Sequence, residues 1–103
     1  MKYPIMYSPA AVRDLDRTWS EMFDASKSVD TADRYVEELM ETVKKKEEVP
    51  GSGSPLYYDD LFTGYYFVVF KAYIAFYRID GGRVLVDRVL YGKSEYLRKL
   101  DLE

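Results

Sequence analysis

The fold is decided by residues 65–90, which read YYFVVFKAYIAFYRIDGGRVLVDRVL. Aromatic and β-branched residues, which favour β-strands, dominate three segments of this stretch: 65–70, 73–79 and 83–90. The connections between them are short, and the one at 80–82 contains an Asp-Gly pair typical of a hairpin turn. Because strands joined by such short connections must be antiparallel neighbours, the sequence predicts a three-stranded meander.

Two amphipathic helices are expected before this meander. Ser8-Pro9 is typical of a helix start, with a capping hydroxyl followed by a proline at the first helical position. The 3–4 spacing predicts that the first helix buries Val12, Leu15, Trp19, Met22 and Phe23 and exposes Arg13, Asp14, Asp16, Arg17 and Glu21. Asp30 is predicted to cap a second helix that runs to about residue 48 and whose apolar stripe is Ala32, Tyr35, Val36, Leu39, Met40 and Val43. Both stripes are interpreted as core packing rather than as a cofactor-binding surface.

The remaining segments complete one domain, residues 1–103. Residues 3–7 are predicted to form a strand at a sheet edge, and Ser94 to cap a short last helix ending at Leu100. Residues 51–55, GSGSP, are interpreted as a flexible connector, since a phosphate-binding loop would continue with Lys-Ser/Thr into a helix. Residues 57–60 are interpreted as a loop packed on the helices, with a lid or partner contact as the alternative. The expected order is β-α-α-β-β-β-α, an α+β fold with both helices on one face of the sheet.

Composition restricts the chemistry that this chain can perform. Of 103 residues, 48% are hydrophobic and 32% charged, as in a globular domain, and Cys and His are both absent. This excludes disulfides, thiol nucleophiles, Cys/His zinc sites and imidazole catalysis, so we expect no metal or other cofactor. The start lacks the apolar region of a signal peptide, and the nearly apolar stretch 65–77 is too short for a membrane helix. We therefore expect a cytoplasmic protein that does not bind membranes.

Charge is distributed unevenly along the chain. The net charge is −3, but residues 1–63 carry −5 and residues 64–100 carry +4. A basic second half favours a partner-facing surface there, although chance asymmetry between solvated faces explains the numbers equally well.

Several short motifs, taken in order, resemble the RelE/ParE superfamily of type II toxin–antitoxin toxins, known also from plasmid stabilization systems. They are Ser8-Pro9-Ala10-Ala11 with Asp14-Leu15 and Trp19, then Ala32-Asp33-Arg34-Tyr35, then Phe76-Tyr77-Arg78-Ile79-Asp80 and Arg88-Val89-Leu90-Tyr91-Gly92-Lys93. The resemblance spans essentially the whole chain. It implies a two-helix hairpin packed on a curved antiparallel sheet, and a flexible antitoxin segment that neutralises the toxin.

The resemblance leaves the molecular target open. One branch of the family consists of metal-independent endoribonucleases (mRNA interferases) that cleave messenger RNA on the ribosome, and another poisons DNA gyrase. Relatives in the nuclease branch commonly carry Arg, His and Arg where this chain has Ile74, Tyr91 and Ser94. These departures favour a gyrase inhibitor, whereas the basic second half and its tyrosines favour RNA. A degenerate toxin that only binds its antitoxin is the third reading, and homodimerisation is also left open.

Six residues are the candidate site. Arg78, Arg88, Tyr91 and Lys93 are assigned to phosphate binding and catalysis, and Tyr96 and Arg98 to substrate binding. As structural residues, Arg78 and Arg88 would instead pair with Asp80 and Asp87. We expect both guanidinium groups on the sheet face opposite the helices, left open for an anionic or protein ligand. Four strand tyrosines are interpreted mainly as core residues: Tyr65, Tyr66, Tyr73 and Tyr77.

Overall fold

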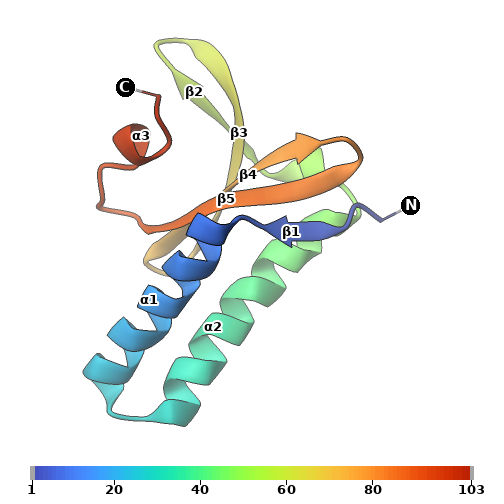
Figure 1. Cartoon of the computed structure of the whole chain (residues 1–103). Helices are drawn as coiled ribbons and strands as arrows, with labels where there is room; N and C mark the ends of the chain where they lie inside the picture. Colours follow the sequence, from blue (N-terminus) through green and yellow to red (C-terminus); the bar gives the residue numbers. More distant parts are fainter. Residues whose placement is uncertain (1, 103) are drawn as a thin grey trace.

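The computed structural model describes residues 2–102, which form two helices packed on one face of a five-stranded sheet (Figure 1). The strand order is β1-β5-β4-β3-β2. Strands β2 to β5 are antiparallel to their neighbours, and β1 pairs in parallel with the outer edge of β5. The elements are β1 (Ile5–Tyr7), α1 (Pro9–Ser26), α2 (Val29–Lys44), β2 (Ser54–Tyr58), β3 (Leu61–Phe70), β4 (Tyr73–Asp80), β5 (Arg83–Tyr91) and α3 (Tyr96–Lys99), with single 3₁₀ turns at Lys45–Glu47 and Pro50–Ser52. The predicted α+β class, the helical hairpin, the meander and the edge position of the first strand are confirmed.

The helix boundaries follow local capping chemistry. The Ser8 hydroxyl accepts a hydrogen bond from the Ala11 amide at 3.0 Å, and Pro9 occupies the first turn of α1. Ser28, rather than the expected Asp30, caps α2 by accepting from the Thr31 amide at 3.2 Å. α1 continues to Ser26 and α2 begins at Val29, so Lys27 and Ser28 alone join the two helices.

The buried side of α1 is rotated by about one residue from the prediction. Ala11, Asp14, Leu15 and Thr18 are buried, whereas Val12 is 47% exposed. The expectation that Asp14 belongs to the solvated face is therefore wrong. Small side chains at positions 11 and 18 let the helix approach the sheet closely, and a hydrogen-bonded carboxylate can replace an apolar group between them.

A fourth antiparallel strand, β2, was not expected. It lies where the sequence was interpreted as a connector followed by a loop, and it pairs with β3 through Ser54↔Phe67 and Tyr58↔Leu61. Pro55 is compatible with this position because β2 is an edge strand, where a missing amide hydrogen is tolerated. Asp59 and Asp60 form the connecting turn with φ angles of 54° and 65°, as a two-residue hairpin turn requires.

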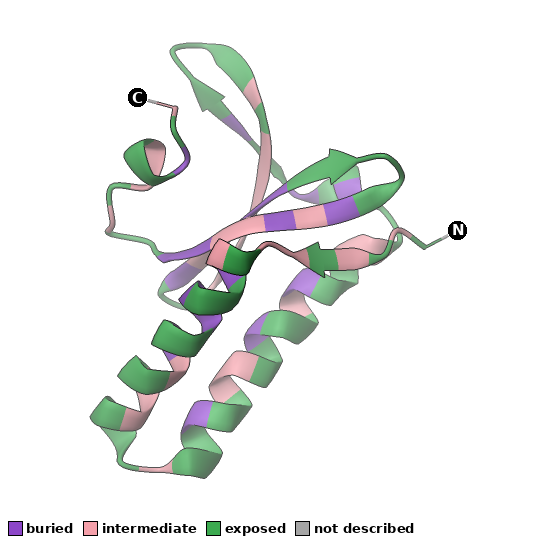
Figure 2. Ribbon diagram, viewed as in Figure 1, coloured by how far each residue is buried: buried purple, intermediate pink, exposed green. Residues whose placement is uncertain are grey.

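Hydrophobic clusters lie on both faces of the sheet. Figure 2 marks the buried residues, which include positions in both helices and in the central strands. The larger one packs α1 and α2 against alternate residues of β4 and β5, including Tyr77 and Val86. The smaller one, on the opposite face, joins Leu56, Phe76 and Leu90 to Leu100 of the C-terminal segment. The face opposite the helices is thus partly covered, contrary to the expectation that it is left open.

Gly53 is the position where the packing leaves least space. A Cβ at position 53 would overlap the Tyr77 hydroxyl, which donates a 2.5 Å hydrogen bond to the Pro50 carbonyl. We expect Gly53→Ala to lower the free energy of unfolding by about 1–3 kcal/mol, as overpacking does. Tyr77→Phe removes the hydroxyl that the new methyl meets, so the double variant should lose less than the sum of the single losses.

Urea denaturation of the parent, both single variants and the double variant measures this coupling. Gly51→Ala is the matched control, because a Cβ there has no heavy atom within 4 Å, and its effect should stay within about 0.5 kcal/mol. Strictly additive losses at positions 53 and 77 would contradict the close contact.

Candidate functional site

Arg78 and Arg88 lie on the same face of the sheet, the one opposite the helices. Their neighbours in sequence, Tyr77 and Val89, belong to the helix-side cluster, and side chains alternate along a strand. Arg88 also lies directly opposite Phe76, a member of the other cluster. This part of the expected arrangement is present.

A β-bulge gives Arg78 its partner. The register of β4 and β5 shifts between Phe76↔Arg88 and Tyr77↔Val86, so Asp87 has no opposite residue. Arg78 Nε donates to Asp87 Oδ2 at 2.7 Å and Nη2 to Oδ1 at 3.4 Å. The Tyr65 hydroxyl donates to the same Oδ2 at 2.9 Å. Tyr65, Arg78 and Asp87, which we call the bulge cluster, are therefore connected by direct hydrogen bonds.

The electrostatics of the bulge cluster favour binding over proton transfer. Burial, followed by the hydrogen bond to Asp87, raises the pKa of Tyr65 to about 12. The hydrogen bond to Asp87 also raises the pKa of Arg78. At neutral pH the cluster thus presents a neutral phenol and a permanent cation. The Arg78 side chain is 45% exposed, so part of its guanidinium can contact a ligand.

Arg88 is held by a carboxylate that sequence reasoning placed in solvent. Asp14, whose side chain is fully buried, accepts from Arg88 Nε at 2.7 Å and from Nη2 at 3.0 Å. It also accepts from the Val89 amide at 2.9 Å and from Arg17 Nη1 at 3.2 Å. The hydrogen bond to Asp14 raises the pKa of Arg88. Of the two pairings considered from sequence, the structure forms Arg78–Asp87, but Arg88 pairs with Asp14.

The other four candidate residues are dispersed. Tyr91 lies opposite Tyr73 and therefore on the helix side, 47% exposed, with its ring 5.8 Å from that of Tyr73. Lys93 is exposed after the end of β5. Tyr96 stacks on Phe76 with ring centroids 5.2 Å apart. Arg98 forms an exposed ion pair with Glu95 at 3.0 Å. Arg78, Arg88 and Tyr96 thus share a face that Tyr91 does not reach.

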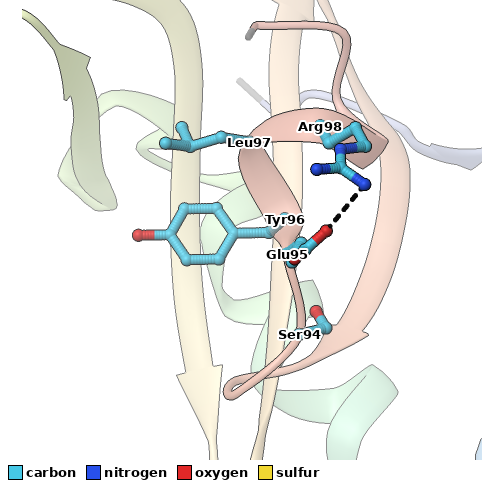
Figure 3. Close-up of a pocket in the computed structure, with 5 residues that line it drawn as sticks. All are labelled: Ser94, Glu95, Tyr96, Leu97 and Arg98. Atoms are coloured by element: carbon cyan, nitrogen blue, oxygen red, sulfur yellow. Dashed lines mark ion pairs between the residues drawn. The ribbon is translucent and has the colours of Figure 1, made fainter.

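A shallow pocket lies at the C-terminal segment (Figure 3). Its volume is about 220 Å³ and it is lined by residues 94–98. In Figure 3, Tyr96 and Leu97 project to one side of the short helix, whereas Glu95 and Arg98 form their ion pair on the other. The ion pair satisfies the one cation at this pocket, so the pocket offers little attraction for an anion.

Neither a metal site nor a membrane span is found in the part of the chain that the structure describes. Within residues 2–102, no three Asp or Glu side chains gather closely enough to hold a metal ion. Over the same residues, no helix combines the length and apolar character that crossing a bilayer requires.

Comparisons with known proteins agree on one group. The family model for the ParE toxin of the type II toxin–antitoxin system, parDE, matches residues 5–96. A chain of the chromosomal ParDE toxin–antitoxin system from P. aeruginosa has a TM-score of 0.73 and 17% identity, covering 87% of this chain and 96% of that one. A chain of the toxin–antitoxin complex RelBE2 from Mycobacterium tuberculosis has a TM-score of 0.64 and 21% identity, covering 88% and 92%. At these identities the two structures share the fold. No curated protein sequence matches the chain.

The buried carboxylate provides a stability test. Asp14→Asn removes the charge that compensates Arg88, so we expect the free energy of unfolding to fall by about 3 kcal/mol. Asp16→Asn is the matched control on the exposed side of the same helix and should change it by less than about 0.5 kcal/mol. Chemical denaturation of both variants measures these changes. An Asp14→Asn variant as stable as the Asp16→Asn variant would show that Asp14 does not hold α1 on the sheet.

Alkaline pH provides a second test. Burial is the main cause that raises the pKa of Tyr7, Tyr65, Tyr73 and Tyr77 from 10.0 to about 12. Because the folded chain holds these protons more tightly, the associated stability is complete below pH 10 and is lost as the pH rises toward 12. A pH titration followed by phenolate absorbance should show a group of tyrosines that ionises well above pH 10, and this group should contain one tyrosine fewer in Tyr65→Phe. Ionisation of all tyrosines near pH 10 in the folded chain would contradict these environments.

Proposed function

The chain belongs to the ParE toxin family of type II toxin–antitoxin systems, and from this membership we propose that it stops growth by binding DNA gyrase rather than by cleaving messenger RNA. The observation that carries the proposal is the commitment of Arg88 to Asp14. A nuclease of this kind needs a cation for the crowded phosphate, a base for the 2′-hydroxyl and an acid for the leaving oxygen. Arg88 was, together with Arg78, a candidate for the first of these roles.

The groups that remain on the face opposite the helices support binding better than catalysis. Tyr65 keeps its proton at neutral pH, since an ordinary tyrosine pKa is already ~10 and burial raises the pKa of Tyr65 to about 12. Arg78 is shared with Asp87, and Tyr91 lies on the other face of the sheet. A poison needs only a surface complementary to its target, and no group with a pKa near neutrality.

We place the target contact at the bulge cluster. Arg78 is the exposed cation there, and the bulge holds Asp87 in a fixed position beside it. A carboxylate of the target could share the guanidinium with Asp87, since a guanidinium has five N–H donors and Asp87 engages two of them.

A cognate antitoxin is the second partner in this proposal. The two similar solved structures are both described as toxin–antitoxin systems, which supports an antitoxin that neutralises this chain. Such an antitoxin would present a flexible segment that folds on binding, so that a large surface is covered by a short chain.

Messenger RNA cleavage is the second candidate, and one feature of the bulge cluster, the pairing of a carboxylate with an exposed guanidinium, supports it. Asp87 could act as a base and Arg78 could bind a phosphate, because the two groups are 2.7 Å apart on an exposed face. Tyr65 beside them could stack against a nucleobase.

Induced expression with two readouts separates the two mechanisms. We expect growth arrest with trapped gyrase–DNA complexes and intact transcripts, relieved when the neighbouring antitoxin gene is co-expressed. Arg78→Ala should reduce gyrase trapping about tenfold or more, the usual effect of losing an interface arginine. Arg83→Ala is the matched control, because Arg83 forms only an exposed pair with Asp80 at 3.8 Å.

Arg88 is not the residue to substitute in this experiment, because its loss would leave Asp14 buried without its partner. Primer extension that reveals cuts at ribosomal A-site codons, with gyrase unaffected, would overturn the proposal in favour of the nuclease. An absence of growth arrest would indicate a chain that only binds its antitoxin.

A further inference from the structure

The outer end of the β2–β3 hairpin carries an apolar surface that neither hydrophobic cluster uses. Four large side chains there are solvent-exposed, and we call them the hairpin patch: Tyr57 (59%), Tyr58 (40%), Leu61 (72%) and Phe62 (47%). The hairpin extends away from α1 and α2 (Figure 1), and its end is coloured as exposed in Figure 2. Tyr57 and Phe62 are cross-strand partners on one face of the hairpin, and Tyr58 and Leu61 are partners on the other. Exposed apolar side chains of this kind mark an interaction site.

The hairpin patch is rigidly connected to the core. Ring contacts run from Tyr57 to Phe62 at 5.9 Å, from Phe62 to Tyr66 at 5.4 Å and from Tyr66 to the buried Tyr77 at 5.7 Å. A groove of about 300 Å³ follows this row, with Pro55 and Gly51 on its other side. Because the rings are already ordered, a partner that covers them loses little conformational entropy from this chain.

The two ends of β2 carry opposite charges. Asp59 and Asp60 form the turn at one end, and no ion pair within residues 2–102 involves either of them. At the other end, Lys46 Nζ lies 3.3 Å from Ser52 Oγ. The acidic turn disfavours nucleic acid on this surface because phosphates would be repelled. The opposite charges instead suit a partner strand that carries the same two charges at its ends and runs in the opposite direction.

We propose that the partner is a second copy of this chain, joined edge to edge through β2. In an antiparallel arrangement with a two-fold axis at Leu56, the middle residue of β2, the turn at Asp59 and Asp60 of each copy comes to the end of the other copy's β2 where Lys46 contacts Ser52. Lys46 of one copy then meets the acidic turn of its mate twice over, as a two-fold interface requires. A parallel arrangement would place acid against acid.

The same arrangement supplies an occupant for the groove. About the axis at Leu56, Tyr57 of one copy lies opposite Pro55 of its mate, which forms one wall of the groove. Pro55 has no amide hydrogen to give to a neighbouring strand, so side-chain packing and charge, rather than a complete backbone ladder, hold the pair together. The dimer is independent of the proposed target, because it uses the free edge of β2 and not the bulge cluster.

Sedimentation equilibrium on the purified full chain tests the dimer. We expect a monomer–dimer equilibrium that Tyr57→Lys weakens by about thirtyfold or more, as loss of an interface anchor does. Val12→Lys is the matched control, an exposed apolar residue on α1, from which the hairpin extends away (Figure 1). Circular dichroism checks that each variant is folded.

A charge swap tests the orientation. Asp60→Lys and Lys46→Asp should each weaken the dimer, and the double variant should restore it. A lysine is compatible with the turn conformation at position 60, because Lys27 and Lys71 already adopt positive φ angles of 57° and 52°. Asp24→Lys, in the last turns of α1, controls for the change in net charge.

Three results would overturn the proposal. They are a chain that stays monomeric at high concentration, a dimer that Tyr57→Lys leaves unchanged, and a swap that fails to restore association although both single variants weaken it. A monomeric chain whose hairpin patch becomes protected from hydrogen exchange only with the antitoxin would assign the patch to the antitoxin instead. None of these results depends on whether gyrase is the target.

Discussion

The structure depends on how the backbone N–H and C=O groups at the outer edge of β5 find hydrogen-bond partners. β1 pairs only with residues 84–86, which leaves the polar backbone beyond them in need of partners. The start of α1 provides these partners, because the Ser8 hydroxyl donates to the Asp87 carbonyl at 2.7 Å and the Asp14 carboxylate accepts from the Val89 amide at 2.9 Å. Along the second half of β5, the start of α1 therefore supplies the hydrogen-bond partners that a neighbouring strand would otherwise supply. This requirement explains why a carboxylate is buried in the middle of a helix–sheet interface.

The same requirement limits what the site can do. A buried carboxylate needs a cation, and Arg88 is the cation that the sheet places beside it. A guanidinium that compensates Asp14 is poorly available to a phosphate, so stability and RNA cleavage compete for one side chain. Arg78 is also paired, but it is exposed, and its partner Asp87 is only part-buried. The function of such a fold depends on which side chains are left available to bind a ligand after the structural pairs have formed.

The fold could be predicted from the sequence wherever the signals were local. The segments of β3, β4 and β5, the Ser8-Pro9 helix start and the helical hairpin all follow from residues within a few positions of one another. β2 was missed because its Gly/Ser/Pro-rich start is typical of a loop and only the edge position makes it tolerable. The role of Asp14 was missed because its partner Arg88 lies 74 residues away. A signal was present, since Ala11 and Thr18 flank Asp14 at helical spacing and mark the side that approaches the sheet closely.

The basic second half of the chain illustrates why charge along a sequence predicts partners poorly. Residues 64–100 contain seven basic side chains, and five of them have a carboxylate within 4.0 Å: Lys71, Arg78, Arg83, Arg88 and Arg98. Two of these carboxylates, Glu38 and Asp14, come from the acidic first half, so folding brings the opposite charges together. These two pairs reduce the excess of +4 to +2, and the remaining charge is dispersed among ion pairs and does not form a basic face that would attract a polyanion. A surface of mixed charges with an apolar hairpin beside it suits contacts with proteins, because both signs of charge can then find partners across an interface.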